Sequence, residues 1–557
     1  MSIFDSLSIG TKGLYASQLA LNVTGQNISN ANTEGYSRKR IDLSSDKRGD
    51  TKFGEMGFGV EIDKVSRYAD EFLELQIRGQ MSDEGFYTVF DEVFERIENI
   101  LSEPNDSGLN ETMEKFWNAW QDLANNPQDA AAREVTRSSS LVLTDKFQTL
   151  SRQLDELRAS LDSDVVETTN EINGYIRNIY TLNGEVATGE LQNGEANDSR
   201  DKRDLLIRKV STLIDVGVVE DKLGRVTLTT SGNVLVGPSS YIELEVARRS
   251  SERSTATGLS VRTEIVFSST KKVYKPRGGE LKGIMEARDD VLPKYQKWLD
   301  QIAGTFVKEV NQLHTTGYNL DGNTGVLFFD ETGTRADNMA LSAALMQDAR
   351  NIAASAGGST IGLVTESSTV PLAANPKLDL KLIDSKYKNI SLDSIKVMMG
   401  GVQLDEGAGK DYVVDYQFGT ITFLNYARFS GSEPIDVSFR YDTAGYPGPG
   451  NGSNALDIAR LRDKQSMSRV EGGDVNQSIG NFYSGVIGVL GIERNQAQAN
   501  RETRRFLVEQ FENRKTEITG VSLDEELANM IKFEHTYQSS ARFISSINRM
   551  LDVLMNL

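Results

Sequence analysis

The side chains that most often carry out catalysis or bind transition metals are scarce in this chain. None of its 557 residues is a cysteine, which excludes a disulfide framework, a thiolate zinc site and a cysteine nucleophile. Only two histidines are present, His314 and His535, so a catalytic triad or a histidine-rich metal centre would have to be built on one of them. His535 stands between Phe533 and Tyr537 on an expected helix, and His314 ends another, where a positive charge suits the helix dipole. We interpret both histidines as structural.

One acidic loop could hold a calcium ion, but its spacing argues against that use. In the segment NLDGNTG, Asp321 and Asn323 stand two residues apart, as calcium ligands often do. An EF-hand needs glycine at the sixth position and glutamate at the twelfth, whereas Val326 and Thr332 stand there. A glycine-rich phosphate loop is also missing from the sequence. The sequence therefore predicts no enzymatic activity, no metal and no cofactor.

Side-chain amides, by contrast, gather in one place near the N-terminus. The stretch NVTGQNISNANTEGYSRKR, residues 22–40, holds four asparagines and directly follows a leucine-periodic segment that looks helical. Asn and Gly weaken an isolated helix by about 0.7 and about 1 kcal/mol per residue relative to Ala. Their chemistry is hydrogen bonding, because each amide both donates and accepts. Judged by itself, the stretch is a frayed helix end that runs into a surface loop, with Gly35 at the turn.

Two apolar stripes at the chain ends mark the helices that would position these amides. In the first stripe an apolar residue recurs every seven positions, and a small residue follows each one three places later, which would let another backbone come close. That stripe fits either an ordinary core-facing helix or a helix that packs against another chain. Its members are Leu7, Leu14, Leu21 and Ile28. The C-terminal stripe is Leu523, Leu527, Met530, Tyr537, Ala541, Ile544 and Leu551, with Glu534 and Asn548 at the skipped seam positions.

A long heptad pattern and two strand-rich blocks lie between the ends. Apolar residues from Phe147 to Val186 are spaced by three and four with one stutter at Val165, which predicts a rod-like helix roughly 60 Å long. Alternating apolar and polar residues predict strands from about 205 to 277 and again within 357–447, whose Gly-, Pro- and Ser-rich flanks are typical of an inserted domain. Further helices are expected over 66–101, 280–313 and most of 455–557. The two terminal stripes should pair.

The hexapeptide ANTEGY, residues 31–36, resembles the N-terminal motif shared by flagellar rod, hook and hook-associated proteins. The continuation Ser37-Arg38 resembles the hook-associated protein 1 branch, which commonly has Pro in place of Glu34 and Gln in place of Lys39. The segments that begin FWNAWQDLANNP, GGELKGIMEARD and GVSLDEELANMI are similar to that branch too, whereas the 357–447 block shows no specific match.

This resemblance implies a structural protein that forms the first junction zone between flagellar hook and filament, from subunits stacked in a helical array. It implies export by the flagellar type III apparatus without a cleaved signal, hence a secreted, flagellar location. The implied partners are copies of the chain itself, the hook protein, the next hook-associated protein and an export chaperone that holds the C-terminal segment. Asn27, Asn30 and Asn32 would then hydrogen-bond across subunits, and Gly35 and Tyr36 would belong to the same assembly surface. Both chain ends would be disordered in the free molecule and would fold on assembly.

Charge and hydropathy exclude other partners. The net charge of −19 argues against nucleic acid and against an anionic membrane surface, since both require a basic face. No run of eighteen apolar residues occurs, so no membrane insertion is expected. The alternatives to the junction role are a sibling role as hook protein or flagellin, and a surface-exposed adhesive filament component.

The expected fold class is multidomain α plus β. A long α-helical hairpin or coiled-coil base is built from both chain ends, and β-rich outer domains are inserted in the middle. The expected parts are an inner terminal helical domain (1–40 and 520–557), a long-helix rod domain (41–204, 278–318 and 455–519), a β-rich middle domain (205–277 and 319–356) and an inserted β-rich outer domain (357–447).

Overall fold

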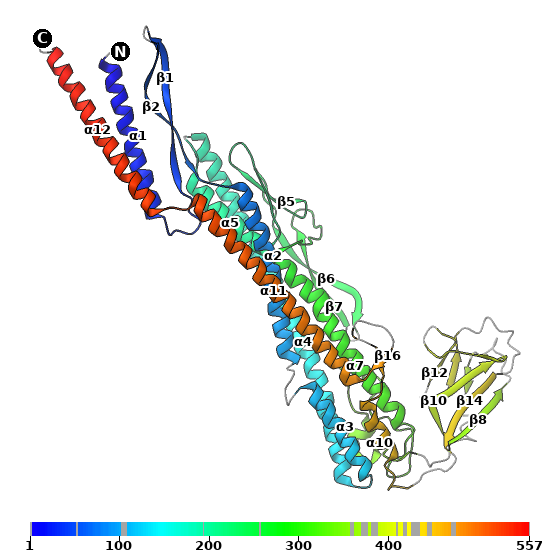
Figure 1. Ribbon diagram of the computed structural model, residues 1–557. Coiled ribbons are helices and arrows are strands. Elements are labelled where there is room, and N and C mark those ends of the chain that lie inside the picture. The colour runs from blue at the N-terminus through cyan, green and yellow to red at the C-terminus, as the bar shows by residue number, and fades with distance from the viewer. Residues whose placement is uncertain are drawn as a thin grey trace. The chain divides into compact units, whose positions relative to one another are not determined.

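The computed structural model describes residues 3–51, 54–101, 108–192, 194–255, 258–356, 361–368, 377–379, 388–407, 410–415, 420–424, 435–442, 448–468, 470 and 475–555. The chain divides into two compact units. Figure 1 labels the helices and strands along the chain. Unit 1 comprises Met1–Phe94, Ala159–Asp290 and Glu493–Leu557. Unit 2 comprises Glu95–Arg158 and Val291–Ile492.

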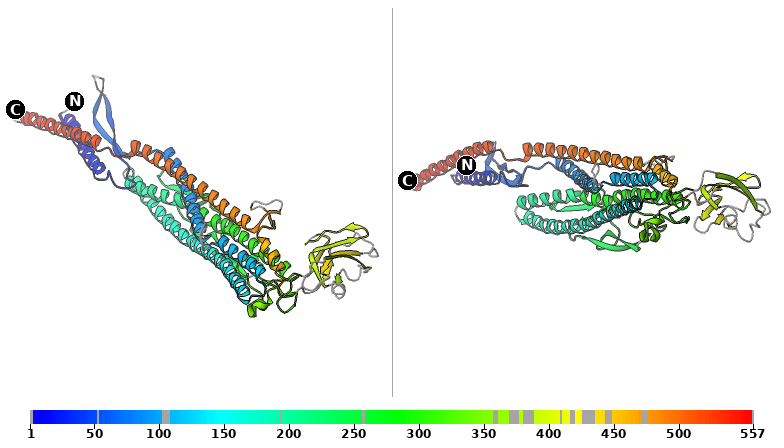
Figure 2. Two further views of the ribbon diagram at one scale, coloured as in Figure 1. Left: turned by 60° about the horizontal axis from the view of Figure 1, so that its bottom comes forward. Right: turned by 90° about the horizontal axis from the view of Figure 1, so that it is seen from below.

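The two chain ends form a pair of helices in unit 1. Helix α1 (Ile3–Ser29) and helix α12 (Leu523–Met555) lie side by side, as Figure 2 shows from two further directions. A Cβ added to Gly10 would lie only 2.8 Å from Cγ1 of Ile544, and one added to Gly13 would lie 3.1 Å from Oγ of Ser540. The small residues of α1 therefore let the α12 backbone approach closely. The expected pairing of the terminal helices is confirmed.

A long β-hairpin follows α1, which the sequence analysis missed. Strand β1 (Lys39–Thr51) pairs antiparallel with β2 (Gly54–Arg67), and the register shifts at three points. The hairpin lies against α1. A Cβ added to Gly59 would come within 3.3 Å of the Ile9 backbone, and the φ of Gly59 is +103°, in the region that favours glycine. The sequence places this segment in the helical rod domain, and KRIDLSSDKRGDT lacks the apolar alternation that identifies a strand.

Helices form the rest of the unit 1 framework, with three of them contributing only in part. Helices α5 (Asn197–Leu213) and α6 (Gly279–Glu286) belong to it whole, whereas α2 (Glu71–Leu101), α4 (Ala130–Gln192) and α11 (Ile479–Thr519) also have residues in unit 2. The heptad predicted for α4 is confirmed, since Val165, Ile172, Ile179 and Val186 are completely buried. The strands expected from residue 205 begin later, because α5 continues to Leu213. A short apolar run such as the one in α5 fits a strand or a helix equally well, so periodicity alone could not assign it.

The strands of unit 1 form two small antiparallel sheets. Strands β3 (Gly217–Glu220), β4 (Val226–Thr230) and β5 (Asn233–Val236) make one sheet, and β6 (Leu244–Thr255) and β7 (Gly258–Phe267) make the other. Both are held to α4 by buried amides. Asn183 bonds both backbone groups of Val226, and Asn173 does the same for Leu244.

Unit 2 is built around an aromatic core. Helices α3 (Leu109–Asn125), α7 (Leu292–His314) and α10 (Ser453–Ala459) surround it, and a π-helical turn η1 (Ala287–Val291) joins α6 to α7. In the core, the Trp117 and Phe306 rings stack at 4.8 Å. Short elements complete the unit: α8 (Ala343–Gln347), η2 (Ala349–Asn351), η4 (Arg460–Arg462), β15 (Met467–Ser468) and β16 (Val475–Gln477).

The segment 319–356 differs from the β-rich structure expected for it. It is described throughout, and it contains α8, η2 and isolated bridges such as Phe329–Leu341, but no strand. It also belongs to unit 2, whereas strands β3 to β7 belong to unit 1. The two segments expected to form one middle domain therefore do not share one.

The inserted block is rich in strands, as expected. A four-stranded sheet has the order β11-β10-β14-β8, and a three-stranded sheet has the order β12-β13-β9; all neighbours are antiparallel. Side chains of Val397, Ile421, Val437 and Phe439 are completely buried. The bounds are β8 (Ile361–Ser368), β9 (Lys377–Asp379), β10 (Lys388–Met399), β11 (Val402–Gln403), β12 (Tyr412–Asp415), β13 (Thr420–Phe423) and β14 (Ile435–Asp442).

Candidate assembly surface and the joint beside it

The terminal helix pair buries little apolar surface. Within the described parts of α1 and α12, the only apolar side chains that are fully buried are those of Ala16, Ala20, Val23 and Ile547. The predicted stripe of Leu7, Leu14, Leu21 and Ile28 is half-buried along its whole length. The pair therefore leaves a continuous apolar stripe only partly covered.

The seam of α12 differs from the predicted one at several positions. Leu523 and Leu527 are each 50% exposed, so they lie outside the seam. Phe533, Ser540 and Ile547 line the seam in place of the predicted Glu534 and Asn548, which are exposed, and the predicted Ala541 is half-buried beside it. The buried and half-buried side chains at heptad spacing are those of Glu526, Met530, Phe533, Tyr537, Ser540, Ile544, Ile547 and Leu551.

Asn27 is the polar centre of the joint between α1 and the strand that follows it. Its amide nitrogen donates to the Lys39 carbonyl over 2.9 Å, and its amide oxygen accepts from the Lys39 N–H over 3.0 Å. The oxygen also accepts from the Tyr36 hydroxyl over 2.8 Å, and the nitrogen also donates to Glu526 over 3.2 Å. We expected Asn27 to bond across subunits. The structure instead uses both ends of its buried amide within the chain.

Gly35 and Tyr36 also serve this joint. Gly35 has a φ of +78°, in the region that favours glycine, and a Cβ there would lie 3.3 Å from Cβ of Leu205. Burial, together with the nearby carboxylates of Asp201, Asp198 and Glu526, raises the pKa of the Tyr36 phenol. The hydroxyl therefore stays protonated and can donate to the Asn27 amide.

Arg38, the residue just before β1, ties the start of that strand to the start of α12. Its N–H donates to the Thr519 carbonyl over 2.9 Å. Its Nε donates to Glu526 over 2.7 Å, and one Nη donates to Glu525 over 2.5 Å. The two acceptors differ sharply in environment, since the Glu526 side chain is 3% exposed and that of Glu525 is 63% exposed.

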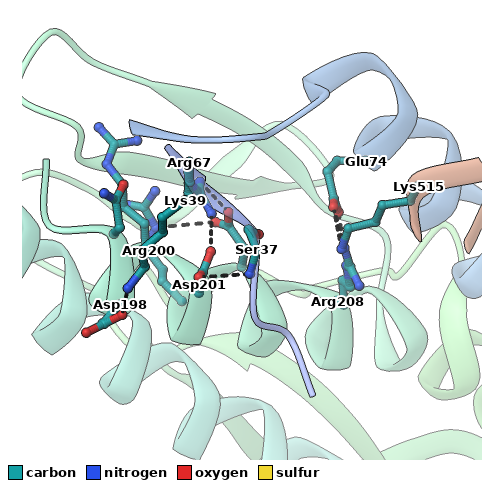
Figure 3. A network of polar contacts seen from close by, with 12 residues as sticks. Ser37, Lys39, Arg67, Glu74, Asp198, Arg200, Asp201, Arg208 and Lys515 are labelled. Carbon is teal, nitrogen blue, oxygen red and sulfur yellow. Dashed lines mark hydrogen bonds and ion pairs between the residues drawn. The ribbon is translucent and has the colours of Figure 1, made fainter. Parts of the chain in front are cut away.

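Asp201 on α5 anchors the other side of the strand (Figure 3). It accepts from the Ser37 N–H over 3.1 Å and from Arg67 over 2.9 Å. Lys39 forms an ion pair with Asp198 on the same helix. Burial raises the pKa of Asp201, and the positive charge of Arg67 and the Ser37 bond act against that rise. Residues 37–39, which join the ANTEGY motif to β1, are thus fixed between α5 and α12.

Glu74 on α2 joins two further helices beside this site. Lys515 of α11 pairs with it over 3.0 Å, and Nε of Arg208 on α5 donates to it over 2.9 Å, as Figure 3 shows. Arg208 also pairs with Glu512 of α11 over 3.2 Å. Lone acidic residues such as Glu74, Asp201 and Glu526 carry no motif in the sequence, which is why the sequence analysis did not find them.

The remaining predicted residues lie as follows. The Asn30 amide donates to the Gln26 carbonyl over 3.0 Å, and Asn32 is exposed, so a role of either across subunits stays a prediction. Asp321 of the candidate calcium loop pairs with Arg350. Within the described residues, no cluster of three or more His, Cys, Asp or Glu side chains is arranged to bind a metal. A search of the described helices also found none long and apolar enough to cross a membrane.

Comparisons with known proteins show which family the chain resembles. A family model of the helical domain of flagellar hook-associated protein FlgK matches residues 94–329. A model of the flagella basal body rod protein matches residues 7–36, and one of the C-terminal part of the flagellar basal body rod FlgEFG proteins matches residues 514–557. Flagellar hook-associated protein 1 of Bacillus subtilis is 26% identical over 588 residues, spanning 100% of this chain and 98% of the relative. Along its whole length the chain is similar to proteins of the FlgK family.

Other FlgK relatives agree over the whole length. Flagellar hook-associated protein 1 of Escherichia coli is 27% identical over 561 residues, which cover 98% of each chain. The solved structure of the flagellar hook junction protein FlgK from Burkholderia pseudomallei has a TM-score of 0.56 and 18% identity, covering 80% of this chain and 100% of that one, so it shares the fold. The resemblance inferred from the ANTEGY motif is confirmed. These similarities support a structural role for the chain in the hook-associated part of the bacterial flagellum.

Proposed function

We propose that copies of this chain stack in a helical array to form the first junction zone between flagellar hook and filament. The terminal helices α1 and α12 make the contacts between copies. The observation that supports this proposal is the half-buried stripe of Leu7, Leu14, Leu21 and Ile28 on a helix pair that has almost no core of its own. The role is structural rather than catalytic.

The stripe supplies the driving force for assembly. Fully burying a leucine or isoleucine side chain is worth about 1.5–3 kcal/mol relative to leaving it exposed. Each of the four residues is already partly covered by its own chain, so a neighbouring copy adds only the rest. A pair of helices without a core is marginal in isolation, because most helical stability comes from packing an apolar face. The ends therefore become fully ordered only when copies cover the stripe.

Other partners follow from the same surface. The hook protein and the next hook-associated protein meet the two ends of the array. The exposed apolar side chains at the start of α12, Leu523, Leu527 and Ile531, are 50% to 56% exposed, and they are the proposed contact of an export chaperone before the chain is secreted. The chain then reaches the flagellum through the flagellar export apparatus.

Deleting the gene tests the role directly. The deletion strain is expected to make hooks and to shed unattached filament subunits into the medium, which electron microscopy and analysis of the medium would show. Expression of the intact chain should restore attached filaments. A chain carrying Leu14→Gln and Leu21→Gln should not restore them, whereas Leu223→Gln, at an exposed turn of unit 1, should. Filaments attached to hooks in the deletion strain would rule out the junction role.

A further inference from the structure

We propose that Glu526 is a positioning residue that makes the two chain ends dock as one unit. One buried carboxylate ties together α1, the segment just before β1 that holds Arg38, and the first turn of α12. The inference deepens the proposed assembly role, on which its biological use rests. The coupling itself belongs to a single chain and can be measured without assembly.

The geometry assigns each oxygen of this carboxylate to a different N-terminal element. Oε1 accepts from Nε of Arg38 over 2.7 Å, and Oε2 accepts from the amide of Asn27 over 3.2 Å. Asn27 is the last buried residue of α1, and Arg38 follows the motif turn. Both partners lie almost five hundred positions away in sequence, with separations of 499 and 488 residues. The Glu526 side chain of α12 therefore makes both of its bonds only when α1 and the segment that holds Arg38 are docked.

The position of Glu526 within α12 favours this role. It lies in the acidic first turn, where the helix dipole stabilises a negative charge. Its own N–H donates to the Ser522 carbonyl over 2.9 Å, so the residue is fixed to the start of the helix. The Thr519 carbonyl, just before that start, accepts from the Arg38 N–H over 2.9 Å. If α1 undocked, Glu526 would stay at the start of α12 and would lose its hydrogen bonds to Asn27 and Arg38.

Burial makes the coupling strong. The Glu526 side chain is 3% exposed, and a buried carboxylate that loses its cationic partner is costly because water does not replace the lost bonds. Glu525, beside it, bonds to the same Arg38 but is 63% exposed, so water compensates for its loss. Docking of the two ends therefore depends on Glu526 and not on Glu525.

The chain has no cysteine, which allows a clean measurement of docking. A Cβ at position 13 would lie 3.9 Å from Cβ of Ser540, within the range that disulfides require. The full-length chain carrying Gly13→Cys and Ser540→Cys is equilibrated in glutathione buffers of graded redox potential. The fraction cross-linked gives the effective concentration of one thiol at the other. This quantity reports docking even where the docked state is a minority of the free chain.

The expected result is a contrast between neighbouring carboxylates. Glu526→Gln should lower the effective concentration at least about tenfold, the loss expected for a charge-assisted hydrogen bond of about 1.4 kcal/mol. Glu525→Gln should change it less than about twofold. Arg38→Gln should also lower it at least about tenfold, and the double variant should lose less than the two single losses added together, because both variants remove the same Arg38–Glu526 ion pair.

Two controls keep the outcome decisive. Thermal unfolding followed by circular dichroism should show that the rest of the chain melts as before in every variant. Equal effective concentrations in the Glu526→Gln and Glu525→Gln chains would overturn the coupling. So would additive losses in the double variant. Because the measurement uses the free chain, it can fail while the deletion strain still shows the junction role, and the reverse also holds.

Discussion

At the scale of single residues, helix asparagines have one recurring use in this molecule. Asn27, Asn173, Asn183 and Asn311 each bond both the N–H and the carbonyl of a single residue in an extended segment. Such a segment would otherwise leave buried backbone groups without partners, which costs free energy. The amide thus acts as a short piece of strand carried by a helix. This explains why poor helix formers are retained at these positions.

Removing one such amide should destabilise unit 1. Asn173→Ala leaves the N–H and carbonyl of Leu244 without their side-chain partner, at about 1–3 kcal/mol for a buried unsatisfied group. Asn178→Ala, at an exposed position of the same helix, should change the free energy of unfolding by less than about 0.5 kcal/mol. Urea unfolding of both variants measures the difference. Equal losses would contradict the backbone-bonding role.

A buried carboxyl gives the fold a pH dependence. Burial, and then the charges of Glu171 and Glu92, raise the pKa of Glu280 from its ordinary value of 4.5 to about 7. The folded state therefore holds this proton more tightly than the unfolded chain. The resulting contribution to stability is fully present below pH 4.5 and is lost as the pH rises through about 7.

Glu280→Gln should remove that dependence. The variant should be more stable than the parent at pH 8, where the parent must carry a buried charge, and it should gain nothing at pH 4.5. Glu286→Gln, in the same helix, is the matched control, since the Glu286 side chain is 42% exposed. Urea midpoints at the two pH values provide the test. A gain of the same size at both would show that Glu280 is not the group responsible.

His314 shows a limit of sequence reasoning at this scale. The sequence predicted a positive charge at the end of a helix. In the structure the ring is buried, its Nδ1–H donates to the Val326 carbonyl over 2.6 Å, and its Nε2 accepts from the Ala353 N–H over 2.8 Å. Burial lowers the pKa of the ring to about 4, so it is neutral. Both partners come from a segment without regular structure, which no pattern in the sequence places beside the helix.

At the scale of elements, periodic patterns were reliable where one row of apolar residues stood out. The heptad of α4 is of this kind, and its buried face was predicted almost residue by residue. In α12 two neighbouring rows are both apolar in part, so the sequence could not choose between Phe533 and Glu534 as seam positions. The β1–β2 hairpin was missed because its first strand lacks the apolar alternation that identifies a strand, whereas in the structure the hairpin packs against α1. Tertiary contacts decided each of these cases.

The close approach of α1 and α12 can be tested with two glycines of one helix. Gly10→Val places a branched side chain against Ile544 and Phe543, at distances a Cβ does not tolerate, and should force the helices apart. At Gly25 nothing lies within 4 Å of an added Cβ, so Gly25→Val should leave docking intact. The thiol pair at positions 13 and 540 measures the result, with at least an about tenfold loss of effective concentration expected for Gly10→Val alone. A similar value for both variants would contradict the observed packing.

At the scale of the whole molecule, stability is distributed unevenly. The long helices of unit 1 bury complete rows of apolar side chains, whereas the terminal pair buries only four such residues in its described part: Ala16, Ala20, Val23 and Ile547. Regions with few buried contacts open at low free energy cost. The terminal helices are thus attached at the joint around Asn27, and the rest of their apolar surface is only partly buried. We propose that neighbouring copies of the chain bury the remaining apolar surface of these helices.

Hydrogen–deuterium exchange of the full-length chain tests this claim most directly. In the free chain, peptides from α1 and α12 should exchange within seconds while those from α4 in unit 1 stay protected. In isolated hook–filament complexes the same terminal peptides should become as slow as those of α4. If α1 and α12 were already protected in the free chain, assembly would not be what completes the chain ends, and the proposal would be wrong.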